Sequence, residues 1–115
     1  MDDGIGATEF FTQDDSILQV GQIALSSEKR ILAHRHLPVP RSTVGTNEVL
    51  VILKGTLKMH LYGDGSDIEI TKEVREGQAV LLVGGGHAFE SATDCKILEI
   101  KNGPFLKNSD KEYLE

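Results

Sequence analysis

Hydrophobic and polar residues follow the two-residue period of β-strands along much of this chain. Residues 56–62 and 96–101 alternate most clearly, whereas residues 47–53 and 79–83 are almost wholly apolar, which is typical of strands covered on both faces. No convincing helical period occurs before the C-terminal residues. Short strands at regular spacing, with turn residues between them, predict an all-β fold of the antiparallel sandwich or barrel type.

Turn residues mark where these strands should end. The glycine-containing segments at 63–66, 76–78 and 84–87 predict turns, and a further strand should start at Ile68. The segment 84–87 could also be a phosphate-binding loop, but no helix follows it to supply an N-terminal dipole, which favours a tight turn.

Two further strands are expected nearer the N-terminus. Residues 16–25 predict one or two strands with a bend at Gly21, and residues 30–36 predict another. Pro38 and Pro40 cannot donate hydrogen bonds to a neighbouring strand, so the residues after His36 should form a long loop.

The length of 115 residues predicts one domain. We expect a flexible, polar N-terminal segment over residues 1–15, the β-domain over residues 16–105, and a tail over residues 106–115 that is either irregular or a short helix.

The composition narrows the classes of partner. A net charge of −6 without a run of Lys or Arg argues against nucleic acid, and no apolar stretch is long enough to cross a bilayer. Cys95 is the only cysteine, so no intrachain disulfide can form, and the first residues do not resemble a signal peptide. We therefore expect a cytoplasmic protein that binds neither nucleic acid nor membrane.

The residues with the strongest chemical signal are His34 and His36. Side chains two positions apart project from the same face of a β-strand, so both imidazoles should lie side by side. Two adjacent imidazoles can provide half of a metal site. An isolated histidine is more often a surface or hydrogen-bonded core residue, so the site depends on further ligands elsewhere in the chain.

The chain resembles the cupin superfamily at two motifs. His34-x-His36, Glu48 and Gly55 match the core of the first cupin motif, although Glu28 stands where that motif begins with glycine. Gly77, Gly85 and His87 match the second motif, with Val83 at the position of its proline. The resemblance implies a double-stranded β-helix, the cupin jelly-roll barrel. The ending from Glu99 to Phe105 is also similar to small cupins associated with surface-polysaccharide biosynthesis.

The resemblance also implies a metal site made of His34, His36, Glu48 and His87. Three imidazoles and one carboxylate suit a divalent transition metal, namely Fe, Mn, Ni, Zn or Cu, and do not choose among them. His60 lies on the opposite strand face from Met59, so we expect it to face solvent or a partner subunit rather than the site.

Other residues are candidates for catalysis or substrate binding. Glu99 and Lys101 share a strand face and either move a proton in the barrel mouth or form an ion pair at its rim. Arg41 either binds a carboxylate or phosphate group or is a solvated loop cation. Phe89 either forms a wall of the pocket or fills the core.

Two classes of function remain open from the sequence. The first is a metal-dependent isomerase, epimerase or dioxygenase acting on a small sugar-derived or carboxylated molecule. The second is a non-catalytic module that binds a small molecule or a metal. In either case a homodimer is expected, because Val49, Val51 and Leu53 form an apolar strand face that a second subunit could cover.

Overall fold

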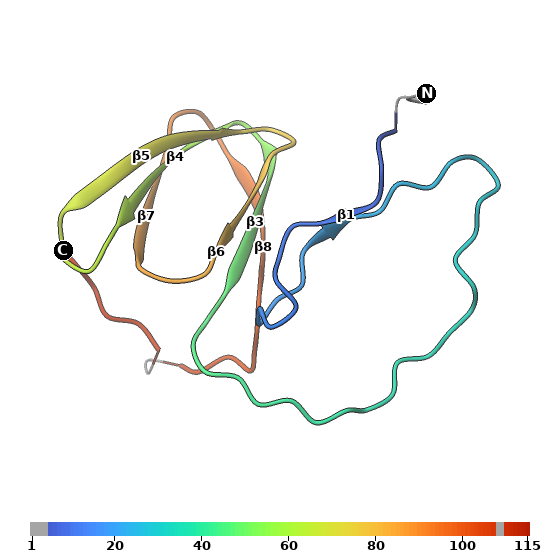
Figure 1. Ribbon diagram of the computed structural model, residues 1–115. Coiled ribbons are helices and arrows are strands. Elements are labelled where there is room, and N and C mark those ends of the chain that lie inside the picture. The colour runs from blue at the N-terminus through green and yellow to red at the C-terminus, as the bar shows by residue number, and fades with distance from the viewer. Residues whose placement is uncertain (1–4, 108–109) are drawn as a thin grey trace. The chain divides into compact units, whose positions relative to one another are not determined.

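The computed structural model describes residues 5–107 and 110–115. The chain forms two compact units. The first unit ends at Val44 and the second begins at Gly45, and their positions relative to one another are not determined (Figure 1). The described residues form strands and no helix, which confirms the predicted all-β class. Residues 110–115 of the expected tail are irregular, while residues 1–4 and 108–109 of the two expected end segments lie outside the described residues.

The first unit is organised around one short antiparallel pair, β1 (Glu9–Phe10) with β2 (Gly21–Gln22). Phe10 pairs with Gly21, and its ring occupies the space that a side chain at Gly21 would need. Gly21 therefore does not interrupt a strand, as the pattern over residues 16–25 suggested. It is the position at which a strand forms, because the missing side chain leaves room for the aromatic ring.

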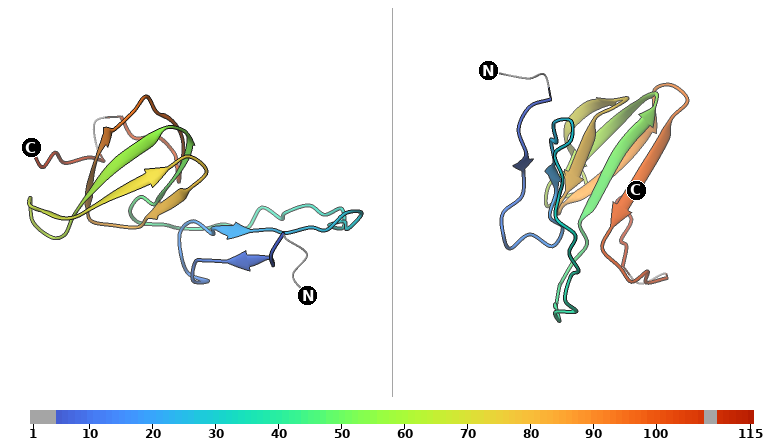
Figure 2. Two further views of the ribbon diagram at one scale, coloured as in Figure 1. Left: turned by 90° about the horizontal axis from the view of Figure 1, so that it is seen from above. Right: turned by 90° about the vertical axis from the view of Figure 1, so that its right-hand side faces the viewer.

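The strand predicted over residues 30–36 is absent, and this expectation was wrong. Figure 2 shows the chain running from β2 to β3 without any strand. Between Arg30 and Val44, the backbone hydrogen bond of the described chain is local and runs from the Val39 amide to the Leu37 carbonyl at 2.8 Å. Alternation predicts which side chains share a face, but a strand also needs a neighbouring backbone as hydrogen-bond partner. The long loop expected around Pro38 and Pro40 does lack strand structure.

The second unit is built from two three-stranded antiparallel sheets. Its strands are β3 (Glu48–Lys54), β4 (Thr56–Tyr62), β5 (Ile68–Arg75), β6 (Ala79–Leu82), β7 (Gly86–Ser91) and β8 (Lys96–Lys101). One sheet has the order β6-β3-β8 and the other the order β5-β4-β7, and Figure 1 shows them on opposite sides of the unit. This arrangement is a β-sandwich, and it includes the strands predicted between residues 47 and 101.

The chain changes sheet four times along the second unit: between β3 and β4, β5 and β6, β6 and β7, and β7 and β8. The sharpest change is at Gly55, a single residue between β3 and β4. Gly55 has φ +85°, and a Cβ atom there would collide with the carbonyl oxygen of Asp94. Glycine is therefore required at this corner both for its backbone conformation and for the close approach of another backbone.

Aliphatic side chains from both sheets fill the space between them. The buried cluster comprises Leu50, Ile52, Leu57, Met59, Val74 and Leu82. Ile52 is the most deeply buried of these, with 1% of its surface exposed. Leu53, the next residue along β3, is 48% exposed, as the alternation of strand side chains requires.

The beginning of β3 is tied to the end of β8 by one side chain. The Asn102 Oδ1 atom accepts a hydrogen bond from the Asn47 amide at 2.8 Å, and its Nδ2 atom donates to the Gly45 carbonyl at 3.1 Å. The amide group of Asn102 thus satisfies two backbone groups where the regular strand pairing ends. This contact fixes the backbone immediately before Glu48.

Candidate functional site

A cavity of about 610 Å³ lies within the second unit. That volume is in the range of small-molecule binding sites. Its chemically active wall residues come from three strands in two sheets, and they are Glu48 on β3, His87 on β7, and Glu99 and Lys101 on β8. Leu50, Leu82 and Ile97 form part of its apolar wall, and Gly84, Gly85 and Gly86 form part of its rim.

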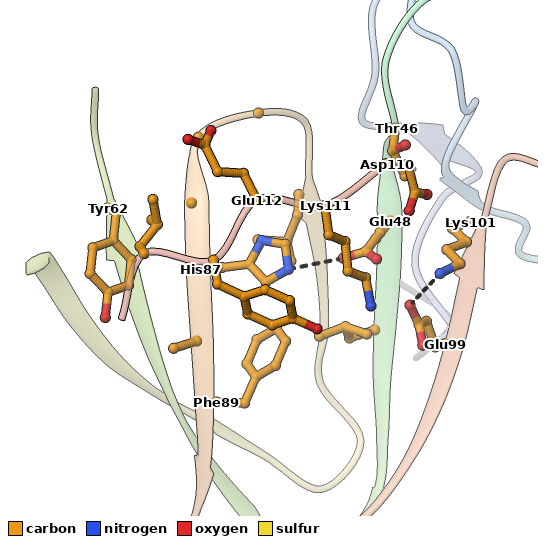
Figure 3. Close-up of a pocket in the computed structure, with 18 of the residues that line it drawn as sticks. Thr46, Glu48, Tyr62, His87, Phe89, Glu99, Lys101, Asp110, Lys111 and Glu112 are labelled. Carbon is orange, nitrogen blue, oxygen red and sulfur yellow. Dashed lines mark ion pairs between the residues drawn. The ribbon is translucent and has the colours of Figure 1, made fainter. Parts of the chain in front are cut away.

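Glu48 and His87 are in direct contact across the cavity. Oε2 of Glu48 lies 3.2 Å from Nε2 of His87, as drawn in Figure 3. The carboxylate side chain is 13% exposed and the imidazole 32% exposed. A carboxyl group and an imidazole at this distance can exchange a proton, or can bind one metal ion together.

Glu99 and Lys101 line the same cavity from β8, and their side chains form an ion pair at 3.7 Å. Register explains their place beside Glu48. Lys101 pairs directly with Glu48, and Glu99 pairs with the next inward-facing residue, Leu50. The shared strand face expected from the sequence is therefore present. The pair faces the cavity, and Glu99 remains 47% exposed.

The surroundings of Glu48 favour its protonated form. Burial raises the pKa of the Glu48 carboxyl, and a hydrogen bond with the Glu99 carboxyl raises this pKa further. The nearby charge of His87 acts in the opposite direction, as does that of Lys101. The net effect is a pKa above the ordinary value of 4.5, so Glu48 can hold a proton at a pH where an exposed glutamate would have lost it.

His34 and His36 lie in the first unit, side by side as expected even though no strand is present. Their ring centroids are 5.2 Å apart and the rings meet edge to face at 72°. Nδ1 of His34 is 2.8 Å from the carbonyl oxygen of Leu32. A carbonyl oxygen only accepts hydrogen bonds, so Nδ1 carries the proton and Nε2 of the neutral ring keeps its lone pair free for a metal.

Glu48 and His87 are suited to hold a metal ion. Two ligand atoms at about 2.1 Å from one ion and at right angles to each other lie about 3 Å apart. The 3.2 Å between Oε2 of Glu48 and Nε2 of His87 agrees with that separation, and equally with a direct hydrogen bond between the two side chains. Within residues 5–107 and 110–115, no cluster of three or more metal-binding side chains is assembled. The expected ligands fall into two units of undetermined relative position, so the complete four-residue site remains a prediction.

The remaining candidates have different surroundings. Phe89 lines the cavity, with its ring centroid 5.2 Å from that of His87. Arg41 belongs to the extended part of the first unit and is exposed. His60 does not line the cavity. It lies between Thr71, at 2.8 Å from Nδ1, and Glu90, at 3.4 Å from Nε2, with 13% of its side chain exposed.

One part of the cavity lining was not predicted from the sequence. Residues 110–115 line it together with the strands, and Figure 3 labels Asp110, Lys111 and Glu112 of this segment around Glu48 and His87. The segment has no strand or helical pattern that would predict its position. The only sequence signal is a pair of apolar residues, Tyr113 and Leu114, in an otherwise charged tail.

Comparison with known proteins does not assign the site. Models of known protein families, curated protein sequences and solved structures give no match to this chain.

Proposed function

We propose that the second unit is a cupin-like jelly-roll barrel whose cavity binds a small polar molecule and, with a divalent metal ion, moves a proton on it. One observation carries the proposal. Glu48, His87, Glu99 and Lys101 line a single cavity although they belong to three strands in two sheets. Convergent titratable groups in a cavity of ligand size are characteristic of acid–base sites.

Backbone conformation supports the resemblance to cupins. Gly55, Gly77 and Gly85, which match glycines of the two cupin motifs, all have positive φ, at +85°, +85° and +73°. Glu28 stands at the remaining motif glycine and has φ +68°, a conformation that non-glycine residues seldom adopt. The repeated change of sheet between successive strands also agrees with a jelly roll.

The metal would be held in this cavity by Glu48 and His87. The resemblance adds His34 and His36, and the free Nε2 of His34 has the chemistry that a ligand needs. When bound, a divalent ion supplies Lewis-acid polarisation of a substrate carbonyl or hydroxyl. Fe, Mn, Ni, Zn and Cu all remain compatible with nitrogen and oxygen ligands of this kind.

The proton would be moved by Glu99 and Lys101. Both face the cavity, and their 3.7 Å separation lets the ammonium group of Lys101 stabilise the carboxylate that forms when the carboxylic acid of Glu99 releases a proton. Because Glu48 is a proposed metal ligand, the proton is held by the Glu99 and Lys101 pair and not by Glu48. These groups can therefore hold a proton beside a bound molecule and return it, as an isomerase or epimerase requires.

The excess of acidic side chains in the cavity lining restricts the kind of ligand that can bind there. Its strand wall contains Glu48 and Glu99 against the single cation Lys101, and residues 110–115 add Asp110, Glu112 and Glu115 against Lys111. An acidic cavity disfavours a free anion but accepts a neutral polyhydroxylated molecule, or a carboxylated one bound through a metal ion. Of the two proposed substrate classes, sugar-derived and carboxylated molecules, a sugar-derived molecule therefore fits best.

The test begins with the metal. Protein purified without chelator should contain about one transition-metal ion per chain by elemental analysis. The metal-loaded protein is then assayed against sugars, sugar nucleotides and keto acids. Turnover should disappear in Glu99→Gln and in Lys101→Met while the metal content stays the same, because neither residue is a proposed ligand.

Other outcomes separate the alternatives. Binding of a compound without turnover would favour the non-catalytic module. Protein that neither contains metal nor takes it up after incubation would refute the metal-dependent function. Activity that persists in both variants would show that the proton is moved by other groups.

A homodimer remains a proposal on separate grounds. On the apolar face formed by Val49, Val51 and Leu53, Leu53 is 48% exposed, but Val49 is already buried within the chain at 8% exposed. Leu98 and Ile100, which lie beside this face on β8, are each 47% exposed. An apolar face of this kind is commonly buried against a second subunit. Analytical ultracentrifugation that finds only monomer at micromolar concentration would contradict it.

A further inference from the structure

The C-terminal segment Asp110–Glu115 lines the cavity from outside the strand framework. As seen in Figure 3, the side chain of Lys111 lies between those of His87 and Glu48. Every residue of this segment is part of the cavity lining. A bound molecule must therefore either share the cavity with this segment or push it aside.

The contact that seats the segment is made by Leu114 at Gly86. A Cβ atom placed on Gly86 would lie 2.5 Å from Cδ1 of Leu114, so the leucine occupies the space that the glycine leaves free. Leu114 is 38% exposed, whereas its neighbour Tyr113 is 81% exposed. Leu114 is thus the more deeply seated of the two apolar residues in the segment.

Little else holds the segment in place. In the part of the chain that the structure describes, residues 110–115 belong to no strand, and no hydrogen bond connects them to the sheets. A segment fixed by side-chain contacts alone opens at low free-energy cost compared with a paired strand. Release of the segment therefore breaks no strand pairing.

We infer that residues 110–115 are a displaceable cover of the cavity, seated by Leu114 on Gly86, and that their release increases the access of a ligand to His87. The cover concerns the same cavity as the proposed function, but it does not depend on which molecule or metal binds there. Both sides of its contact are required: the side chain of Leu114 and the absence of a side chain at Gly86.

The experiment measures access to the cavity directly, with diethyl pyrocarbonate as the probe. This reagent modifies exposed imidazoles, and mass spectrometry of full-length, metal-free protein gives the rate at each histidine separately. Leu114→Ser removes the apolar seat, and Gly86→Ala fills the notch. Each should raise the modification rate of His87 about three- to tenfold, since each removes much of the burial of one leucine.

Three controls accompany the variants. Gly84→Ala lies on the same rim but has no atom within 4 Å of the added carbon, so the His87 rate should not change. Leu114→Met keeps an apolar seat and should stay close to the parent protein. His60, which does not line the cavity, serves as an internal reference, and an unchanged rate there shows that the sheets remain folded.

The outcomes are distinct from those of the proposed function. Equal His87 rates in the parent protein, Leu114→Ser and Gly86→Ala would overturn the cover. A raised His87 rate in both variants, in a protein that binds no metal and no sugar, would support the cover and refute the function. If Gly86→Ala proves unstable because of its 3.2 Å approach to Tyr62, the result rests on Leu114→Ser.

Discussion

The carboxylate of Glu48 and the imidazole of His87 meet at 3.2 Å although they start from strands in different sheets. Glu48 is the first residue of β3, and His87 is the second residue of β7. Neither strand pairs with the other, so their contact depends on how the two sheets face each other. The packing of the core between the sheets therefore sets the geometry of the site.

Metal affinity should depend on this pair. Replacing His87 by Ala should raise the dissociation constant for Zn²⁺ or Mn²⁺ at least about tenfold, because a direct ligand is lost. Isothermal titration calorimetry on chelator-treated protein measures this change. His60→Ala is the matched control, since this histidine also contacts a glutamate but lies outside the cavity. Equal losses in the two variants would contradict the assignment of His87.

Stability should depend on pH through Glu48. Its pKa is raised in the folded protein, so the folded state binds a proton more tightly than the unfolded state does. This contribution to stability is fully present below the ordinary pKa of 4.5 and is lost as the pH rises through the folded-state pKa. Glu48→Gln should remove that loss. Urea denaturation of metal-free protein should therefore find the variant more stable, relative to the parent protein, at pH 7 than at pH 4. A constant difference between the two pH values would contradict the prediction.

The corner at Gly55 should tolerate no side chain. Gly55→Ala should lower the free energy of unfolding by about 2–5 kcal/mol, because alanine disfavours the positive φ and its Cβ atom would meet the Asp94 carbonyl. Gly65→Ala, in the turn between β4 and β5, has open space around the added carbon and should change stability by less than about 0.5 kcal/mol. Thermal and urea denaturation give both values, and a tolerated Gly55→Ala would show that the corner is formed differently.

Neighbouring residues on β3 should respond very differently to truncation. Ile52→Ala should cost about 2–5 kcal/mol, since its side chain fills the space between the sheets. Leu53→Ala should cost less than about 1 kcal/mol in the monomer because half of that side chain is exposed. A large loss at Leu53, in protein that sediments as a dimer, would instead indicate that this face is covered by a partner subunit.

The sequence predicted β3, β4, β5, β6 and β8, each of which has its partner within the same unit, but it predicted a turn over residues 84–87, where β7 begins at Gly86. The bounds predicted for residues 56–62 and 96–101 are those of β4 and β8. Residues 30–36 have comparable strand character, but they form no pairing in the described chain. Local pattern cannot reveal whether a partner backbone is present, so the prediction failed there.

The sequence predicted only those features of the candidate site that follow from the alternation of side chains along a strand. Parity correctly grouped Glu99 with Lys101 on β8. The rings of His34 and His36 do lie together, but without the strand from which that was predicted. The contact of Leu114 with Gly86 has no such basis, because the segment has no periodicity and the two residues are distant in sequence. Contacts of this kind follow from tertiary packing alone.

The double hydrogen bond of Asn102 has a mechanical consequence. It fastens the chain just before β3 to the chain just after β8, and these are the first and last strands of the second unit. The start of β3 and the end of β8 are therefore held together beside Glu48, both by strand pairing and by the Asn102 side chain. Loss of the Asn102 side chain would therefore release the backbone that positions Glu48, one of the residues that line the cavity.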